Sequence, residues 1–457
     1  MTVPAREEQN ALELCADVVA RTRAAGADEA EAYYLAERTT NVEVLEGRLD
    51  ALTAAESRGI GLRVLIGGAL AFAWASDLGA AGRAELADQA TRLAREATPE
   101  PGRALPEPLP IPDRALDIDD PSLADVTTEQ KVALLTRLEA AARAEDPRVA
   151  ATHLCRYGDS VDLCAVVNSR GIAGAYRATS CYVALSTIAR QDGEAQRGYA
   201  GGVAHGVGGL DVDEVGRRAA RRATLTLGGE PIPTTRATVV LDPDIAAELL
   251  RGVTQALSGD AVTRGRSMFV GCTGQRVGSS LVTLRDRGNL PGGPRTAPFD
   301  GEGIPTGSTT LIETGVLRGF LHTSETARRA GTASTGNAIR SAYRVAPDVG
   351  PTNLVLEPGP LTGAELIRGV DYGQYVVATR NVGGINPVSG DYSVGASGRL
   401  IERGELTRPV TGVTIAGPMP ELLANVVAVG SDARWAVGQA PVWTPTIRID
   451  GVAIGGR

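Results

Sequence analysis

The sequence predicts an α+β protein made of two halves, the first of helices packed on an antiparallel sheet and the second rich in strands. Amphipathic helical segments alternate with runs of strand-type residues in the first half of the 457-residue chain. Short strand-type runs between glycine-rich turns dominate the second half. Gly228–Thr235 separates the two and has the composition of a linker. We therefore expect an N-terminal domain at residues 1–228 and a C-terminal domain at residues 229–457.

The composition describes a globular protein with a core of aliphatic side chains. Hydrophobic residues make up 43% of the chain and aromatic residues only 4%, so valine, leucine, isoleucine and alanine must fill most of the interior. The formal net charge is -8. A protein that grips nucleic acid needs a clustered basic face, so we expect no direct contact with nucleic acid.

The ends and the cysteines predict a cytoplasmic location. No apolar segment follows the start, and no run of eighteen apolar residues occurs, so we expect neither a signal peptide nor a membrane span. The five cysteines lack a Cys-x-x-Cys pair. Such a sparse, odd set is typical of free thiols in a reducing compartment.

The N-terminal half is expected to contain two lobes, at about residues 1–98 and 122–228. Helical periodicity predicts a helix at each end of the first lobe, with strands between them. A second lobe begins with a helix that we expect Ser122 to cap. Its last helix carries four arginines, which suit either a phosphate contact or, as we favour, a solvated or partner-facing surface. The predicted elements are helices 7–25, 79–97, 123–144 and 213–227, and strands 32–36, 40–44, 59–64, 69–73, 149–157, 161–168 and 172–190.

The stretch Pro99–Pro121 joins the two lobes. It is rich in proline, aspartate and glutamate. Proline lacks the backbone N–H that a helix or a central strand requires, so we expect an extended connector.

The C-terminal half opens with a strand at 238–241 and a helix at 244–257, with Pro243 in the first turn of the helix. Further on, Arg380–Gly398 combines many glycines with little apolar bulk and lies between strands expected at 375–379 and 399–402. A bulged hairpin and a ligand loop both fit this composition, and Asn386 and Asp391 suit local side-chain turns. The other expected elements are strands 281–285, 309–313, 316–322, 353–357 and 446–449, and helices 325–330 and 362–368.

Several glycine-rich motifs resemble those of the TldD/PmbA family. They are Gly383–Pro387, Ser389–Ser393, Gly398–Glu405 and Thr414–Gly417 near the C-terminus, and Arg58–Leu65 near the N-terminus. The resemblance covers nearly the whole chain and implies a C-terminal half of the TldD/PmbA type. It also implies a link to zinc-dependent peptide cleavage and to modulation of DNA gyrase.

The resemblance places a metal site on helix 244–257 in the zinc-bearing branch of the family. That branch carries His-Glu, three residues, then His, shortly before Leu-Glu-Gly-Asp, and a later cysteine before Gly-Gln. Aligning Leu257–Asp260 with this ending puts Leu250 and Arg251 at the His-Glu pair and Gln255 at the second histidine. Arg434, ahead of Gly438–Gln439, falls near the cysteine. The resemblance therefore implies the PmbA/TldE-like branch, without zinc.

A count of the possible zinc ligands in the sequence, made without the resemblance, also argues against a zinc site. Hydrolytic zinc needs about three protein ligands from histidine, cysteine or carboxylate. The three histidines, His153, His205 and His322, lie in separate segments. His153, Cys155 and Cys164 would share a sheet face if a hairpin formed around Gly158–Asp159, although core packing suits them equally. We assign no catalytic residue, no metal ligand and no cofactor.

Five residues are candidates for binding a peptide or a partner. Asn337 and Arg340, in the family-like motif Thr335–Arg340, carry amide and guanidinium groups suited to a peptide backbone or a carboxylate. A turn-stabilising role suits them equally. Asn386, Asp391 and Tyr392 belong to the glycine-rich segment, whose backbone suits strand addition to a peptide.

The resemblance implies a metal-free subunit that binds and presents peptides to a TldD-like zinc peptidase, with zinc in that partner. A heterodimer is expected, and a homodimer of the isolated chain stays open. Two alternatives remain: a stand-alone hydrolase with an unrecognised site, such as His153 with Cys155, and a scaffold without enzymatic activity.

Overall fold

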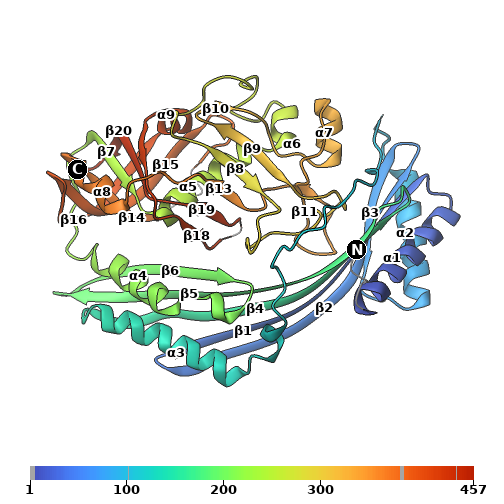
Figure 1. Ribbon diagram of the computed structural model, residues 1–457, viewed down its shortest axis with the longest axis horizontal. Coiled ribbons are helices and arrows are strands. Elements are labelled where there is room, and N and C mark those ends of the chain that lie inside the picture. Colours follow the sequence, from blue (N-terminus) through green and yellow to red (C-terminus); the bar gives the residue numbers. More distant parts are fainter. Residues whose placement is uncertain (1–5, 101, 381–384, 439) are drawn as a thin grey trace.

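The computed structural model describes residues 6–100, 102–380, 385–438 and 440–457. It contains helices together with largely antiparallel sheets, which confirms the α+β class. Figure 1 shows the N-terminal half as a long curved sheet and the C-terminal half as a second body lying along its inner side. No described helix is long and apolar enough to cross a membrane.

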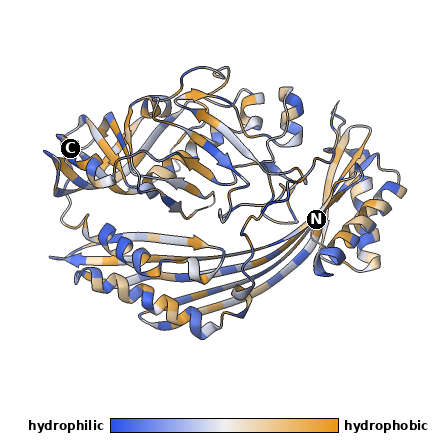
Figure 2. Ribbon diagram, in the orientation of Figure 1, coloured by the Kyte–Doolittle hydropathy of each residue, from blue (hydrophilic) through white to orange (hydrophobic). Residues whose placement is uncertain are grey.

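The N-terminal sheet is a single antiparallel sheet in the order β3-β2-β1-β4-β5-β6. In Figure 2 hydrophobic and hydrophilic residues alternate along its strands, as expected for strands whose two faces differ. Its strands are β1 (Glu29–Leu45), β2 (Arg48–Ile66), β3 (Ala69–Ala75), β4 (Val149–Asn168), β5 (Ala173–Gln191) and β6 (Glu194–Ala204).

Two of these strands are longer than the sequence predicts. The predicted break between 36 and 40 does not exist, because β1 pairs with β2 and with β4 through this stretch. The predicted break at residues 158–160 is also wrong, because β4 runs unbroken for 20 residues, and no hairpin forms at Gly158–Asp159. Asp159 stays in the strand because its buried carboxylate lies 2.6 Å from the Lys131 ammonium on the covering helix.

Four helices cover one face of this sheet and form two cores. Helices α1 (Arg6–Ala24) and α2 (Ala80–Glu96) cover one end, around Tyr34, Ile60 and Leu62. Helices α3 (Thr128–Glu145) and α4 (Val212–Thr224) cover the other end, around Val42 and Tyr157. Since β1 and β4 take part in both cores, they tie the two lobes together.

Helix α3 begins later than the sequence predicts. A short 3-10 helix, η1 (Pro121–Asp125), precedes it. Thr127 and Gln130 form a capping box, in which each side chain bonds the backbone N–H of the other residue. The prediction that Ser122 caps the helix is therefore wrong.

The connector between the lobes holds neither helix nor strand in its described residues 102–120, as predicted. It lies across the sheet. Asn168 of β4 donates a 2.9 Å hydrogen bond to the carbonyl of Pro106, and the N–H of Thr179 on β5 donates to the carbonyl of Ile118. The N–H of Gly292 in the C-terminal half donates to the carbonyl of Leu116 at 2.8 Å.

The C-terminal half contains a six-stranded sheet in the order β16-β15-β14-β7-β20-β17. It closes into a barrel because β16 also pairs with β20. Its strands are β7 (Thr235–Leu241), β14 (Tyr372–Arg380), β15 (Asp391–Glu402), β16 (Glu405–Pro418), β17 (Val426–Val429) and β20 (Ile447–Gly455).

A second six-stranded sheet has the order β10-β9-β8-β13-β19-β18, and β11 pairs with β12 in a separate ribbon. Helix α5 (Pro243–Ala256) contributes half of its residues to the core of this half. The remaining elements are β8 (Leu284–Arg287), β9 (Ser308–Glu313), β10 (Val316–Leu317), β11 (Ala338–Ile339), β12 (Asp348–Val349), β13 (Leu354–Leu356), β18 (Arg434–Ala436), β19 (Val442–Thr444), α6 (Gly259–Thr263), α7 (Ser324–Ala330), α8 (Gly363–Arg368), α9 (Met419–Ala424) and the 3-10 helix η2 (Val207–Gly209).

The glycine-rich segment is only partly a loop. From Asp391 onward it belongs to β15, and Gly398 allows β14 to approach, because a Cβ atom there would lie 1.8 Å from the carbonyl oxygen of Tyr375. Gly383 and Gly384 lie outside the described residues. The strand expected at 281–285 begins only at Leu284.

Candidate functional site

A cavity of about 500 Å³ lies where the edge of the N-terminal sheet meets α5. Strand β6 and helix α4 border it from the N-terminal half, and α5, β14, β15 and β18 border it from the C-terminal half. Its polar and charged lining residues are Ser186, Gln196, Arg197, Tyr199, Arg222, Thr226, Asp244, Glu248, Arg251, Thr379, Arg380 and Ser397.

Helix α5 positions the inner wall of the cavity. Asp242 caps its N-terminus by accepting a 3.0 Å hydrogen bond from the N–H of Asp244, and Pro243 fits the first turn. Asp244, Glu248 and Arg251 follow at helical spacing and line the cavity together. Thus one face of α5, over successive turns, carries charged groups of the site.

Two of the four positions suggested for a zinc site, Leu250 and Gln255, face away from each other. Leu250 is 4% exposed and belongs to the hydrophobic core, whereas Gln255 is exposed. Five residues along an α-helix correspond to a rotation that leaves two side chains about 140° apart. The structure does not bring these two positions together.

Arg251, at the third position, braces the backbone. Its Nε donates a 2.8 Å hydrogen bond to the carbonyl of Ala440, and its Nη2 donates to the carbonyls of Ala436 at 2.9 Å and Val437 at 3.3 Å. Burial lowers the pKa of Arg251. This guanidinium therefore holds the segment that follows β18 against α5.

Arg434, at the fourth position, belongs to a buried ion-pair network. Its Nη2 lies 2.8 Å from Asp242 Oδ1 and 3.6 Å from Asp244 Oδ2. Arg222 of α4 pairs with both carboxylates, and the Tyr375 hydroxyl donates to Asp242 at 3.2 Å. Burial raises the pKa of Asp242, but the two guanidiniums outweigh it and lower that pKa to about 2. The network links the two halves beside the cavity.

These residues do not fit a zinc ion. Leucine and arginine are not zinc ligands in proteins, and the two aspartates nearby are already neutralised by guanidinium groups. Across the described ranges, no group of three or more histidine, cysteine, aspartate and glutamate side chains could hold a metal ion. Gln439, of the Gly438–Gln439 pair, lies outside those ranges.

The proposed cluster of His153, Cys155 and Cys164 does not form. His153 is exposed, whereas Cys155 is buried under α3 and donates to the carbonyl of Leu135 at 3.6 Å. Cys164 is nine residues further along the same strand, roughly 30 Å away. It packs in another cluster, on the sheet face toward the C-terminal half. The prediction of a shared face fails because it required the hairpin that β4 lacks.

The other two histidines bond protein groups. His205 Nδ1 lies 2.5 Å from the carbonyl oxygen of Thr179, and its Nε2 lies 3.1 Å from that of Gly293 in the C-terminal half. His322 is 5% exposed, and its Nδ1 lies 3.2 Å from the Thr326 hydroxyl. Burial lowers the pKa of His322. Both imidazoles contribute to packing within this chain.

Asn337 and Arg340 are buried away from the cavity at α5. Asn337 Nδ2 donates to Asp286 Oδ2 at 2.7 Å and to the carbonyl of Gly350 at 3.0 Å. Arg340 donates to the carbonyl of Gly301 at 2.8 Å, pairs with Glu31, and lies over a tyrosine ring of β1. Their partners are protein groups, and Arg340 also borders a second cavity of about 370 Å³.

The three candidates in the glycine-rich segment, Asn386, Asp391 and Tyr392, lie in different environments. The Asn386 side chain accepts hydrogen bonds from the N–H groups of Val388 at 2.9 Å and Ser389 at 3.3 Å, which confirms the predicted side-chain turn. Asp391 is exposed. Tyr392 is 4% exposed and belongs to the core around the barrel.

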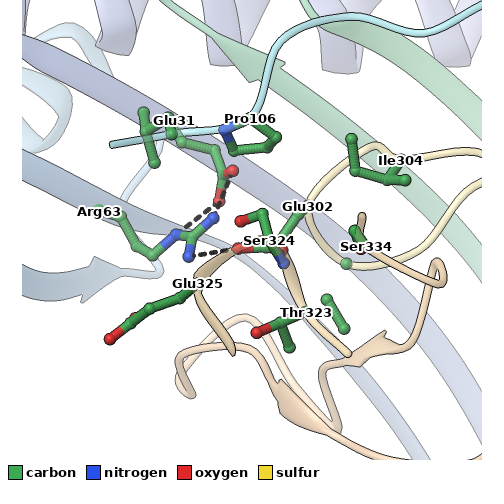
Figure 3. Close-up of polar contacts among 12 residues, drawn as sticks. Glu31, Arg63, Pro106, Glu302, Ile304, Thr323, Ser324, Glu325 and Ser334 are labelled. Atoms are coloured by element: carbon green, nitrogen blue, oxygen red, sulfur yellow. Dashed lines mark hydrogen bonds and ion pairs between the residues drawn. The ribbon is translucent and has the colours of Figure 1, made fainter. Parts of the chain in front are cut away.

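Sequence reasoning missed a buried network that joins the two halves (Figure 3). Arg63 of β2 donates to both carboxylate oxygens of Glu31 on β1, at 2.9 and 2.6 Å, and to Glu302 of the C-terminal half at 2.8 Å. The other oxygen of Glu302 accepts a 2.8 Å hydrogen bond from the N–H of Ser324. An arginine within the apolar run of a strand was the only signal in the sequence.

Three family models match the chain in order. PmbA/TldA metallopeptidase domain 1 matches residues 30–94, the central domain matches 121–227, and the C-terminal domain matches 234–456. Together they span most of both halves, including the cavity between them.

Individual proteins agree with the family models. The metalloprotease PmbA of Escherichia coli O157:H7 is 28% identical over 380 residues, or 82% of each chain. A metalloprotease of Methanothermobacter thermautotrophicus is 28% identical over 436 residues, or 92% of this chain and 93% of the relative. The crystal structure of TldE from Thermococcus kodakarensis matches with a TM-score of 0.89 at 23% identity, over 97% of this chain and 100% of that one, and so shows the same fold. The chain belongs to the PmbA/TldD metallopeptidase family.

Proposed function

We propose that this chain is the metal-free, TldE-like subunit of a two-chain peptidase in the cytoplasm. It binds and presents peptide, and a TldD-like partner subunit carries the zinc and hydrolyses the peptide bond. The observation that carries this proposal is that arginines occupy two of the four positions of the family's zinc site, Arg251 at that of the glutamate and Arg434 near that of the cysteine. One braces backbone carbonyls and the other neutralises Asp242.

The cavity beside these arginines supplies the peptide-binding part of the proposal. Its volume of about 500 Å³ lies within the range of ligand sites. Hydroxyl groups of Ser186, Thr379 and Ser397 and the half-exposed ring of Tyr199 line it. These groups offer hydrogen bonds and an aromatic surface to an extended chain.

Metal analysis and peptide hydrolysis test the proposal. The purified chain should contain no stoichiometric zinc after incubation with the metal and dialysis, and it should not cleave a mixture of unstructured peptides. Adding a TldD-like subunit should produce a complex that binds zinc and cleaves the peptides. The contribution of this chain is then the difference between the rate of peptide cleavage by the complex and the rate by the TldD-like subunit alone.

Two outcomes would contradict the proposal. Stoichiometric zinc with peptidase activity in the isolated chain would assign it a site of its own. Equal peptide cleavage by the TldD-like subunit with and without this chain would leave it no part in the reaction. The variant Arg222→Ala breaks the network beside the cavity and should weaken the stimulation.

A further inference from the structure

The cavity between the halves is rich in arginine although the protein as a whole is acidic. Among its lining residues, four are arginines and two are acidic, in a chain of net charge -8. They come from both halves and from four different elements or their ends. The arginines are Arg197, Arg222, Arg251 and Arg380, and the acids are Asp244 and Glu248.

Both acidic groups already have partners inside the protein. Asp244 pairs with Arg222 and lies 3.6 Å from Arg434. Glu248 accepts a hydrogen bond from the Thr379 hydroxyl, and its burial raises its pKa. Asp244 is therefore neutralised by guanidinium groups, and Glu248 is stabilised by a hydroxyl group and by the nearby charges of Arg251 and Arg222.

Three of the arginines lack such a partner. Among the described residues, Arg197, Arg251 and Arg380 form no close ion pair, although the charges of Glu248 and Asp244 act on Arg251 and oppose the lowering of its pKa by burial. Arg197 and Arg380 are exposed at the cavity, on β6 and at the end of β14. The cavity thus has an excess of guanidinium donors.

Arg251 is held in place by neutral groups. Its contacts with three backbone carbonyls use Nε and Nη2, and no described residue accepts a hydrogen bond from Nη1. A guanidinium fixed in this way keeps its full charge, and it loses little side-chain entropy when a further acceptor binds. Burial away from water strengthens its attraction for an anion.

We propose that this cavity binds the carboxylate of a peptide ligand, with Arg251 and Arg380 as the principal donors. A planar guanidinium matches a carboxylate better than any other side chain does. This inference rests on the proposed function, because it names the part of the peptide that the chain holds. A C-terminal carboxylate and an acidic side chain share this chemistry, and the experiment distinguishes them.

The test measures peptide binding to the full chain, alone and in complex with a TldD-like subunit, by fluorescence anisotropy. One labelled hexapeptide without acidic residues is used with a free C-terminus and with an amidated C-terminus. A third version is amidated and carries one internal glutamate. We expect the free C-terminus or the internal glutamate to tighten binding about tenfold over the neutral peptide. The version that does so identifies the source of the carboxylate.

Variants assign the effect to the cavity. Arg380→Gln removes an exposed guanidinium at a strand end and should abolish the preference for the carboxylate. Arg251→Lys keeps a positive charge but not the planar fork, so it should weaken the preference. Arg137→Gln, on the outer surface of α3, is the matched control. Thermal unfolding of each variant checks that the fold persists.

Three results would overturn the inference: no measurable binding, equal binding of the neutral and charged peptides, or an unchanged preference in Arg380→Gln. These results are separable from failure of the proposed function. Zinc and hydrolysis in the isolated chain, together with a retained carboxylate preference, would overturn the proposed function alone. Stimulation of a zinc-bearing partner without that preference would overturn this inference alone.

Discussion

Arg63 Nη1 and Glu302 Oε1 lie 2.8 Å apart, although the two residues belong to different halves and their side chains are only 6% and 1% exposed. Arg63 also pairs with Glu31, which Arg340 of the C-terminal half contacts as well. Charges from both halves therefore meet in one water-poor network. Removing Arg63 leaves Glu302 buried without its cation, whereas Glu31 keeps Arg340.

Arg63→Ala should lower the free energy of unfolding by about 3–5 kcal/mol, the cost of leaving the buried carboxylate of Glu302 without its cation. Urea denaturation followed by circular dichroism measures this loss. Arg137→Ala, which breaks an exposed ion pair with Asp213, is the control and should change the stability little. A similar loss in both variants would show that the Arg63 network does not stabilise the fold.

Asp300 should make stability fall as the pH rises from about 4 to 7. Burial, and then the charge of Glu302, raise the pKa of Asp300 to about 7, whereas an unfolded aspartate titrates near about 3.9. In this window the folded chain holds a proton that the unfolded chain has lost, so its contribution to stability decreases with pH. Asp300→Asn removes this titration.

The measurement compares the free energy of unfolding of the wild type and of Asp300→Asn from pH 5 to pH 8. The wild type should lose up to about 1.4 kcal/mol per pH unit relative to the variant below pH 7. Parallel profiles for the two proteins would contradict the assignment of the proton to Asp300.

Gly198→Ala should separate α4 from β6. A Cβ atom at this position would lie 2.0 Å from the carbonyl oxygen of Ala219 and 2.4 Å from the amide nitrogen of Ala223, both backbone atoms of α4. Relieving this overlap requires movement of the helix, at about 1–3 kcal/mol. Gly208→Ala is the matched control because it has no atom within 4 Å. Equal unfolding midpoints for the two variants would refute the close approach.

Thr127→Ala should destabilise the protein by about 1 kcal/mol through loss of the capping box of α3. Ser122→Ala should cost less, because the Ser122 hydroxyl bonds the half-buried carboxylate of Asp120, the residue before η1, and not the backbone of α3. Guanidinium denaturation of the two variants decides between them. A larger loss in Ser122→Ala would favour the cap that the sequence predicts.

Local signals in the sequence located most elements, because they depend on neighbouring residues. Asp242 and Pro243 predicted the start of α5, and Asn386 predicted its own turn. Asp159 predicted a break that does not exist, since its strand conformation depends on Lys131 from a helix. A local pattern cannot show which distant partner compensates a charge.

In the candidate site, too, the sequence located residues but did not show their distant partners. The resemblance located Arg251 and Arg434, but not what they contact, because carbonyls near Ala436 and the carboxylate of Asp242 are brought to them by folding. Arg222 was predicted on a solvated or partner-facing surface of its helix and is 6% exposed instead. Its partners are 20 and 22 residues away. Only the structure shows which charged residues of the two halves pair with each other.

Because β1 and β4 run unbroken through both lobes, the sheet holds the lobes together and the proline-rich connector only lies across it. Its exposed stretch, residues 107–115, offers a protease an easy target, yet both lobes share the same sheet. A single nick there would leave a two-fragment particle that elutes from gel filtration like the intact chain and comes apart only in denaturant.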